Sequence, residues 1–216
     1  YCNLKRSNLQ HYLPKKLVEY MSFITNLNRV RNQEIIKQSI ELNNFLLSNN
    51  ISPIFLKGSA NLIAGIYQDI AERVVGDIDF IFSKEDYPKA IKLLRSFGYS
   101  EVKKYKYYYP GGNHYRRLKK ENSIAAIEIH SEMIGYEDIE NYGKEFNYSF
   151  VEKDLQIIDQ VKVLSYANKL NLSIITNQIN DNGFYYKSMA LRNAYDVFLL
   201  SKKTNAKEAV NNLDTL

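Results

Sequence analysis

The chain has 216 residues, a length that suits one large domain or two small ones with a well-buried core. Lysine and arginine number 29 against 24 acidic residues, and the net charge of +5 suits either a polyanionic partner, such as a nucleotide triphosphate or RNA, or simply a mildly basic surface. A single cysteine, Cys2, excludes an intrachain disulfide. Because we find no secretory h-region and no apolar run near the ~18 residues that span a bilayer, we expect a cytoplasmic protein without a membrane partner.

The N-terminal part of the chain predicts a long helix, followed by a short strand and a turn. Apolar residues recur at roughly helical spacing across residues 12–50. An apolar strand at residues 53–56 leads to Gly58, which permits a tight turn. Ser59 is expected to cap the next helix, which runs from residue 60 to about residue 68.

The middle of the chain predicts several strands and one helix. Residues 74–82 form the second expected strand, and a helix capped by Ser83 is expected to end near Phe97, because Gly98 is typical of a helix C-terminus. Further strands are expected at residues 99–109, 114–119 and 123–130. From about residue 137 onward we expect only loops and helices, with amphipathic segments around residues 161–170 and 189–200.

This order of elements predicts an α+β fold, with a small mixed β-sheet core, flanking helices and a helical C-terminal region. The composition changes between residues 135 and 150. We therefore expect residues 1–135 to form the core with its N-terminal helices, and residues 136–216 to form the helical C-terminal region.

Two aspartates alternate with apolar residues in the second expected strand. Residues i and i+2 of a strand project from the same face, so Asp77 and Asp79 point together. Neighbouring carboxylates repel each other unless a cation lies between them, and Mg²⁺ prefers such hard oxygen ligands. A half-exposed edge strand with solvated aspartates is the alternative explanation of this pattern.

A third carboxylate, Glu128, lies in the strand expected at residues 123–130 and shares a face with His130. If the two acidic strands adjoin, Glu128 lies beside Asp77 and Asp79. Two Mg²⁺ ions about 4 Å apart would then hold a hydroxyl and a triphosphate in line, with Glu128 as a candidate to accept the hydroxyl's proton. His130 is either a substrate contact or a structural histidine bonded to the backbone.

The Gly58-Ser59 turn is a candidate phosphate-binding site. Glycine lets the backbone approach a phosphate closely, the following helix presents N–H groups to an anion, and the Ser59 hydroxyl can donate a further hydrogen bond. The alternative is an ordinary serine-capped helix. Lys57 and Arg73 are candidates to neutralise a triphosphate, or else they are solvated or paired at the surface.

Taken in order, these residues resemble the DNA polymerase β-like nucleotidyltransferase superfamily, and within it the uncharacterised bacterial nucleotidyltransferase family. The resemblance covers about residues 30–200 and rests on Leu56-Lys57-Gly58, Arg73, Asp77-Ile78-Asp79, Gly98-Tyr99, Glu128-Ile129-His130 and Leu191-Arg192-Asn193-Ala194-Tyr195-Asp196. It implies a nucleotidyltransferase core that moves an NMP from an NTP, such as ATP, to a hydroxyl acceptor and releases pyrophosphate. On this hypothesis the catalytic and Mg²⁺-binding residues are Asp77, Asp79 and Glu128, and the residues that contact the NTP are Gly58, Ser59, Lys57, Arg73 and His130.

The acceptor is left open between a small molecule, a protein and a tRNA. A basic, tyrosine-rich segment at residues 103–120 suits RNA contact, because cations bind phosphates and rings stack on bases. Lysines are also usual on a solvated hairpin, where they discourage edge-to-edge pairing. Two further hypotheses stand beside the enzyme: a non-catalytic module of the same fold that binds a nucleotide or a partner, and an RNA-modifying toxin.

Overall fold

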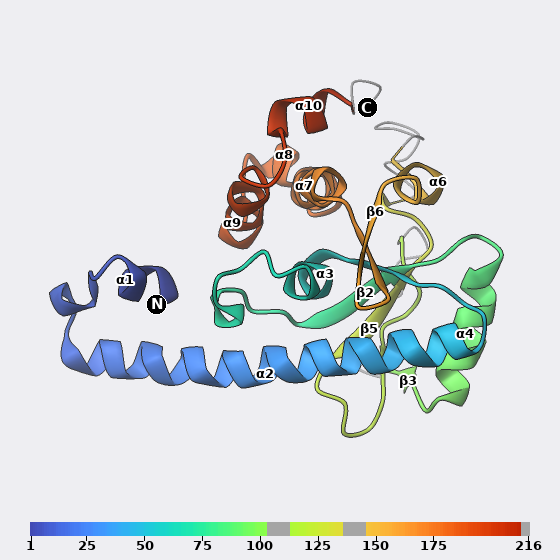
Figure 1. Cartoon of the computed structure of the whole chain (residues 1–216), viewed down its shortest axis with the longest axis horizontal. Helices are drawn as coiled ribbons and strands as arrows, with labels where there is room; N and C mark the ends of the chain where they lie inside the picture. The colour runs from blue at the N-terminus through green and yellow to red at the C-terminus, as the bar shows by residue number, and fades with distance from the viewer. Residues whose placement is uncertain (103–112, 136–145, 213–216) are drawn as a thin grey trace.

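The computed structural model describes residues 1–102, 113–135 and 146–212. Across these residues the fold is α+β, with a mixed seven-stranded sheet in the order β3-β4-β5-β2-β1-β7-β6. Figure 1 shows α2 along one side of the molecule and α7, α9 and α10 gathered on the opposite side, with the sheet between them. The α+β class predicted from the sequence is therefore confirmed.

The strands are short and their pairing is mixed. They are β1 (Ile54–Leu56), β2 (Asp77–Ile81), β3 (Ser100–Glu101), β4 (Leu118–Lys119), β5 (Ala126–His130), β6 (Leu155–Ile158) and β7 (Val161–Leu164). β2 runs parallel to β5, and β1 runs parallel to β7. The other neighbouring strands pair in antiparallel fashion.

The helices differ greatly in length. They are α1 (Cys2–Arg6), α2 (Lys15–Ser48), α3 (Lys57–Ile63), α4 (Asp86–Ser96), α6 (Tyr148–Val151), α7 (Tyr166–Ile175), α8 (Gly183–Tyr186), α9 (Leu191–Leu200) and α10 (Ala206–Asn211). Two short 3₁₀ turns, η1 (Gln10–Tyr12) and η2 (Ile70–Glu72), precede the second strand, and the π-helical turn η3 (Thr176–Asn180) extends α7.

The sheet buries different side chains on its two faces, because successive residues of a strand point in opposite directions. Phe55 and Phe80 pack in the same cluster as Leu42 of α2. Ile81 packs on the other face, in a cluster with Leu172 of α7. The central strands are therefore covered on both faces. In β2, Phe80 faces the side covered by α2, and the next residue, Ile81, faces the side covered by α7.

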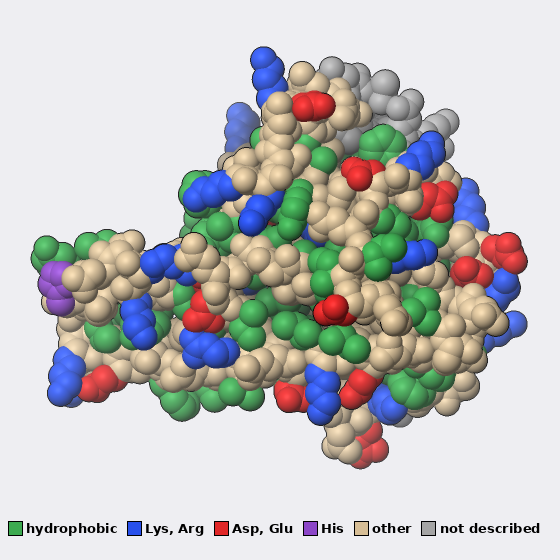
Figure 2. Space-filling model, viewed as in Figure 1, with side chains coloured by type: hydrophobic (Ala, Val, Ile, Leu, Met, Phe, Trp, Pro, Cys, Tyr) green, Lys and Arg blue, Asp and Glu red, His purple; other side chains and the backbone are tan. Residues whose placement is uncertain are grey.

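The long helix α2 confirms the helix predicted for residues 12–50. Its C-terminal half buries Leu42 in the core, whereas its N-terminal half exposes an apolar row that includes Tyr20, Phe23, Leu27 and Val30. Figure 2 shows hydrophobic side chains along the outer side of this helix. No helix in the described parts of the chain is both long and apolar enough to cross a bilayer.

The expectation of only loops and helices beyond residue 137 is wrong for residues 155–164, which form β6 and β7. The apolar residues Val161 and Leu164 were expected in a helix, but a spacing of three residues also fits a fully buried strand, and both lie in β7. β7 pairs with β1 near the middle of the sheet. The division at residue 135 stays a prediction, although this pairing brings both proposed regions into one sheet.

The helix after β1 begins earlier than predicted. α3 starts at Lys57 and ends at Ile63, so Ser59 lies within its first turn and is not its cap. The physical reason is the backbone of Lys57, whose φ of 50° turns the chain directly from the strand into the helix. The turn predicted at residues 110–113, and most of the strand predicted at residues 99–109, lie outside the described residues.

Candidate functional site

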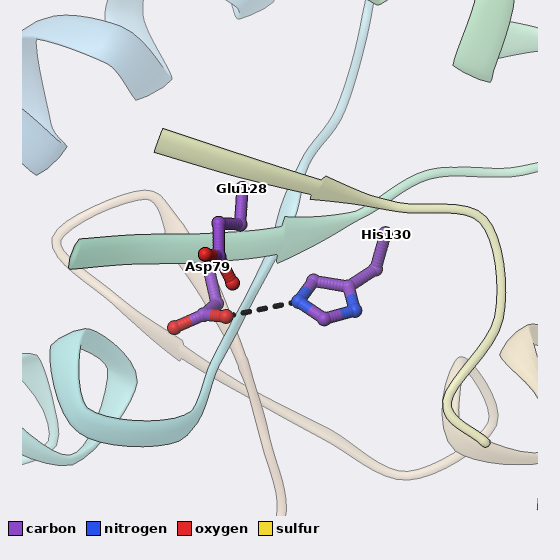
Figure 3. A group of neighbouring side chains, drawn as sticks. All are labelled: Asp79, Glu128 and His130. Carbon is purple, nitrogen blue, oxygen red and sulfur yellow. Dashed lines mark hydrogen bonds and ion pairs between the residues drawn. The ribbon is translucent and has the colours of Figure 1, made fainter. Parts of the chain in front are cut away.

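The two acidic strands are neighbours in the sheet, as predicted. β2 and β5 are parallel, and their register sets Asp79 opposite Glu128. Asp77 and Asp79 lie on the face of β2 that Ile81 shares, which is the face covered by α7. Figure 3 shows Asp79, Glu128 and His130 converging from these two strands.

Asp79 is held by two donors at the same oxygen. It is only 3% exposed, and its Oδ1 lies 2.7 Å from Lys57 Nζ and 2.9 Å from His130 Nε2 (Figure 3). His130 Nε2 also lies 3.2 Å from Lys57 Nζ, and a proton on Nε2 is the tautomer that lets the ring donate to the carboxylate. Its buried Nδ1 has no partner among the described residues. The structure gives Asp79 Oδ2 no such donor among the described residues, so this oxygen remains for another ligand.

Burial and neighbouring charges shift the pKa values of Asp79 and His130. Burial alone would raise the pKa of Asp79, but the charge of Lys57 and the hydrogen bond from His130 hold that pKa well below its usual range. Burial, aided by the charge of Lys57, lowers the pKa of His130 to about 4. At neutral pH the aspartate is therefore ionised and the imidazole is neutral.

Asp77 and Glu128 share an arginine that the sequence had placed only in the basic segment. Arg117 Nε lies 3.0 Å from Glu128 Oε1, and Arg117 Nη2 donates to Asp77 Oδ2. Burial, followed by the charge of Asp79, raises the pKa of the Glu128 carboxyl, and Lys57 opposes that rise. The three predicted carboxylates thus lie on one face, and each has a cationic partner.

The donor atoms in this group suit a divalent cation. One ligand atom from each of Asp79, Glu128 and His130 can be chosen so that all three lie within 4.8 Å of one another. Carboxylate oxygens are the ligands that Mg²⁺ prefers, and no donor within residues 1–102, 113–135 and 146–212 reaches Asp79 Oδ2. His130 already donates to Asp79, so it orients that carboxylate in the way that outer-shell partners commonly orient metal ligands.

A cavity of about 260 Å³ opens beside the carboxylates. Its acidic wall contains Asp77, Asp79 and Glu128, and its opposite wall comes mainly from α7, η3 and α9. The hydroxyl of Thr176, which lines that wall, is buried and has no hydrogen-bond partner in the described part of the chain. π-helical turns are frequent at functional sites, and a buried polar group without a partner calls for an explanation, which a ligand in this cavity would supply.

Lys169 is a cavity-lining residue that sequence reasoning missed. It is 3% exposed, and its Nζ donates to Gln156 Oε1 at 3.0 Å. In the described part of the chain, no carboxylate lies within ion-pair distance of it, and burial lowers its pKa to about 7. The only signal in the sequence was a lysine inside the apolar stretch of α7, which by itself indicates nothing about a cavity.

Arg73 lines the cavity, as its predicted role requires, but it is fixed by a partner that was not foreseen. Its Nε lies 3.2 Å from Asp196 Oδ2, and the hydroxyl of Tyr67 donates to Asp196 Oδ1 at 2.8 Å. Asp196 is 3% exposed, and burial raises its pKa against the opposing charge of Arg73. The late helix α9 thus supplies the group that orients Arg73.

The two residues of the predicted phosphate turn have different surroundings. Gly58 lines the cavity, and a Cβ added to it would lie 3.1 Å from Val75 Cγ2. Ser59 is 1% exposed and is not among the lining residues, and its hydroxyl donates to the carbonyl of Leu56 at 3.2 Å. The part of Ser59 in NTP binding stays a prediction, as does that of the buried His130.

Comparison with known proteins agrees with the architecture of this site. The family described as "Uncharacterised nucleotidyltransferase" matches residues 1–215 of the chain. The chain belongs to this family. The resemblance inferred from the motifs is therefore confirmed, and nucleotidyl transfer is the chemistry that the family's description names.

No curated protein matches the chain. Among solved structures, the lincomycin-bound lincosamide antibiotic adenylyltransferase LnuA is similar at 16% identity and a TM-score of 0.49, over 78% of this chain and 97% of its own. The antibiotic-resistance factor ANT(2'')-Ia is similar at 11% identity and a TM-score of 0.50, over 84% of this chain and 88% of its own. At this identity the second similarity supports the fold alone.

Proposed function

We propose that this family member is a metal-dependent nucleotidyltransferase, which moves an NMP from an NTP to a hydroxyl acceptor and releases pyrophosphate. The observation that carries the proposal is the parallel register of β2 and β5, which sets Asp79 opposite Glu128 at a cavity. The opposite wall of that cavity carries the buried Lys169. Mg²⁺, with two ions expected, would supply charge neutralisation of the triphosphate and activation of the hydroxyl.

The acidic wall is built to hold the cations in a fixed place. Asp79 is immobilised at Oδ1 by Lys57 and His130, so its Oδ2 faces a ligand with little freedom to lose. Asp77 and Glu128 complete the ligand set from the same face of the sheet. The raised pKa of Glu128 also suits it to accept the proton of the attacking hydroxyl.

The opposite wall is built to hold the triphosphate. Asp196 keeps the Arg73 side chain in the cavity, and the guanidinium retains N–H donors beyond the one that this carboxylate uses. Lys169 has a neutral amide as its hydrogen-bond partner and no anionic partner in the described ranges, so an approaching phosphate would give it a close counter-ion. Gly58 leaves the backbone of α3 open to the same space.

The test is Mg²⁺-dependent pyrophosphate release, measured with each NTP in turn and with small hydroxyl compounds, proteins and tRNA offered as acceptors. Asp79→Asn and Glu128→Gln should lower the rate by about 10³-fold, because each removes a charged ligand at the reacting centre. Asp159→Asn, in the turn between β6 and β7, is the matched control. Equal rates in all four proteins would refute the proposal, and NTP binding without turnover would favour a non-catalytic module.

A further inference from the structure

Arg117 occupies an unusual position between the two acidic strands. It lies just before β4, and its guanidinium contacts Glu128 of β5 through Nε at 3.0 Å and Asp77 of β2 through Nη2. The side chains of Arg117, Asp77 and Glu128 are 28%, 27% and 15% exposed. The contact is therefore partly shielded from water, where ion pairs are stronger than at a free surface.

The charges of the group are not balanced with these cations in place. Asp77, Asp79 and Glu128 carry three negative charges, whereas their ion-pair partners Lys57 and Arg117 supply two positive charges. Exchanging the single charge of Arg117 for a divalent cation would balance the group. Lys57 need not move in this exchange, because it bonds only to Asp79 Oδ1 among the three carboxylates.

We propose that Arg117 is an internal cation that competes with the metal: it holds Asp77 and Glu128 together in the unloaded protein and leaves them when a divalent cation binds. This inference rests on the proposed function, since it concerns the same carboxylates. While the guanidinium bridges the two carboxylates, it occupies Glu128 Oε1 and Asp77 Oδ2, and its charge would repel a divalent cation bound to the neighbouring oxygens. Arg117 is thus a regulatory group of the site and not a metal ligand.

The proposal predicts that removing Arg117 has two measurable effects: the unloaded protein becomes less stable, and its affinity for a divalent cation rises. Without Arg117, Asp77 and Glu128 lose the cation that bridges them, so the unloaded protein should unfold at a lower temperature. The divalent cation would no longer have to displace a bound charge, so its affinity should rise about tenfold or more. A residue that only stabilises the fold would produce the first effect without the second.

The experiment measures Mn²⁺ binding by electron paramagnetic resonance and by calorimetry, in the absence of NTP. The proteins are the unmodified chain, Arg117→Gln, Arg117→Lys and Asp79→Asn. Arg116→Gln is the matched control, because Arg116 is adjacent in sequence but bonds to Glu101 at 3.0 Å, outside the acidic group. Thermal unfolding with and without Mn²⁺ gives a second readout on the same samples.

We expect Arg117→Gln to bind Mn²⁺ about tenfold more tightly than the unmodified chain, and Arg116→Gln to bind it equally well. Arg117→Lys keeps the positive charge but loses the two-pronged guanidinium, so it should also bind Mn²⁺ more tightly than the unmodified chain, by a smaller factor. This variant replaces Arg117→Gln in the test if the glutamine variant does not fold. Equal or weaker Mn²⁺ binding by the folded Arg117 variants overturns the inference alone, provided that Asp79→Asn binds less than the unmodified chain. Mn²⁺ binding in none of the proteins overturns both this inference and the proposed metal site.

Discussion

The two walls of the cavity differ in how their charged side chains are paired: one wall carries the three carboxylates of β2 and β5, and the other carries Lys169 of α7. On the acidic wall, every carboxylate has a cation within the protein: Arg117 serves Asp77 and Glu128, and Lys57 serves Asp79. On the other wall, the buried Lys169 has the amide of Gln156 as its one hydrogen-bond partner among the residues that the structure describes. Each carboxylate of the acidic wall thus has a cationic partner before any ligand arrives, whereas Lys169 has no anionic partner among the described residues.

This difference in charge pairing indicates which kind of ligand each wall suits. A wall whose charges are already paired can exchange its cations for metal ions at little net cost, because one set of ion pairs replaces another. A buried ammonium without a counter-ion weakens the folded protein, and it gains most when an anion arrives. On the proposed function, the metal would therefore bind at the strands and the triphosphate would bind beside α7.

The largest expected effect comes from breaking the acidic wall alone. Glu128→Gln keeps the shape of the side chain but removes a charged ligand and the candidate base, so Mg²⁺-dependent pyrophosphate release should fall about 10³-fold. Because the lysine wall is untouched, binding of a fluorescent NTP measured by anisotropy without metal should change less than threefold. A parallel loss of NTP binding would show that the two walls do not act separately.

The second prediction concerns the lysine wall, where binding and stability should change in opposite directions. Lys169→Met should weaken metal-free NTP binding about tenfold, since it removes the unpaired charge. The same change should stabilise the fold at pH 6 by roughly 3 kcal/mol, because burial lowers the pKa of Lys169 to about 7 and a charged amine is costly to bury. Lys153→Met, at an exposed position, is the control and should do neither.

The pH dependence of this stabilisation has a definite sign. An unfolded lysine keeps its proton up to about pH 10.4, whereas folded Lys169 loses it near pH 7. Between these values the unfolded state binds more protons, so the stability of the unmodified protein rises with pH. Urea unfolding at pH 6, 8 and 9.5 should therefore show the advantage of Lys169→Met shrinking as pH rises, and a constant advantage would contradict a buried charge.

The sequence was sufficient to place the three carboxylates of the acidic wall on one face, but it did not reveal the residues of the lysine wall. Alternation in a strand is a local property, so Asp77 and Asp79 could be assigned to one face directly, and the apolar pattern around Glu128 predicted the neighbouring strand. Lys169 and Asp196 reach the cavity only because α7 and α9 pack over the sheet. That packing depends on β7 pairing with β1, a long-range contact that no local pattern specified.

For Arg117 and Ser59, the sequence showed the residue type but could not identify the role. The segment around Arg117 was recognised as basic, but its composition could not distinguish a solvated charge from one that bridges two strands. Ser59 follows a glycine as a phosphate-binding serine would, yet its hydroxyl bonds to the backbone of its own helical turn. In both cases the residue type fitted several roles, and tertiary contacts selected one.

The third prediction tests whether His130 acts by orienting Asp79. His130→Phe removes the donor to Asp79 Oδ1 and leaves only Lys57 to hold that oxygen. We expect Mn²⁺ affinity to fall about tenfold, as for other partners of metal ligands, while metal-free NTP binding stays within threefold. His130→Gln, which can still donate, should recover part of the loss, and the exposed His11→Phe should have no effect. A loss of NTP binding instead would identify His130 as a substrate contact.

The smallest expected effect lies where the two walls meet, at Gly58. Its added Cβ would lie 3.1 Å from Val75 Cγ2, so Gly58→Ala should force Val75 to move and lower stability by about 1 kcal/mol. Thermal unfolding should then shift downward by about 2–4 °C. Gly76→Ala is the matched control, because it lines the same cavity but its Cβ would meet nothing within 4 Å.

The cause of this loss can be separated from any effect on the ligand. If the contact with Val75 is responsible, Gly58→Ala should cost little stability in a Val75→Ala background, because the crowded methyl groups are absent there. If the glycine is needed for a phosphate to approach, NTP binding should stay weak in that double variant although the stability is restored. Recovery of both properties would make Gly58 a packing residue, and the junction of the two walls would then contribute shape but no contact to the triphosphate.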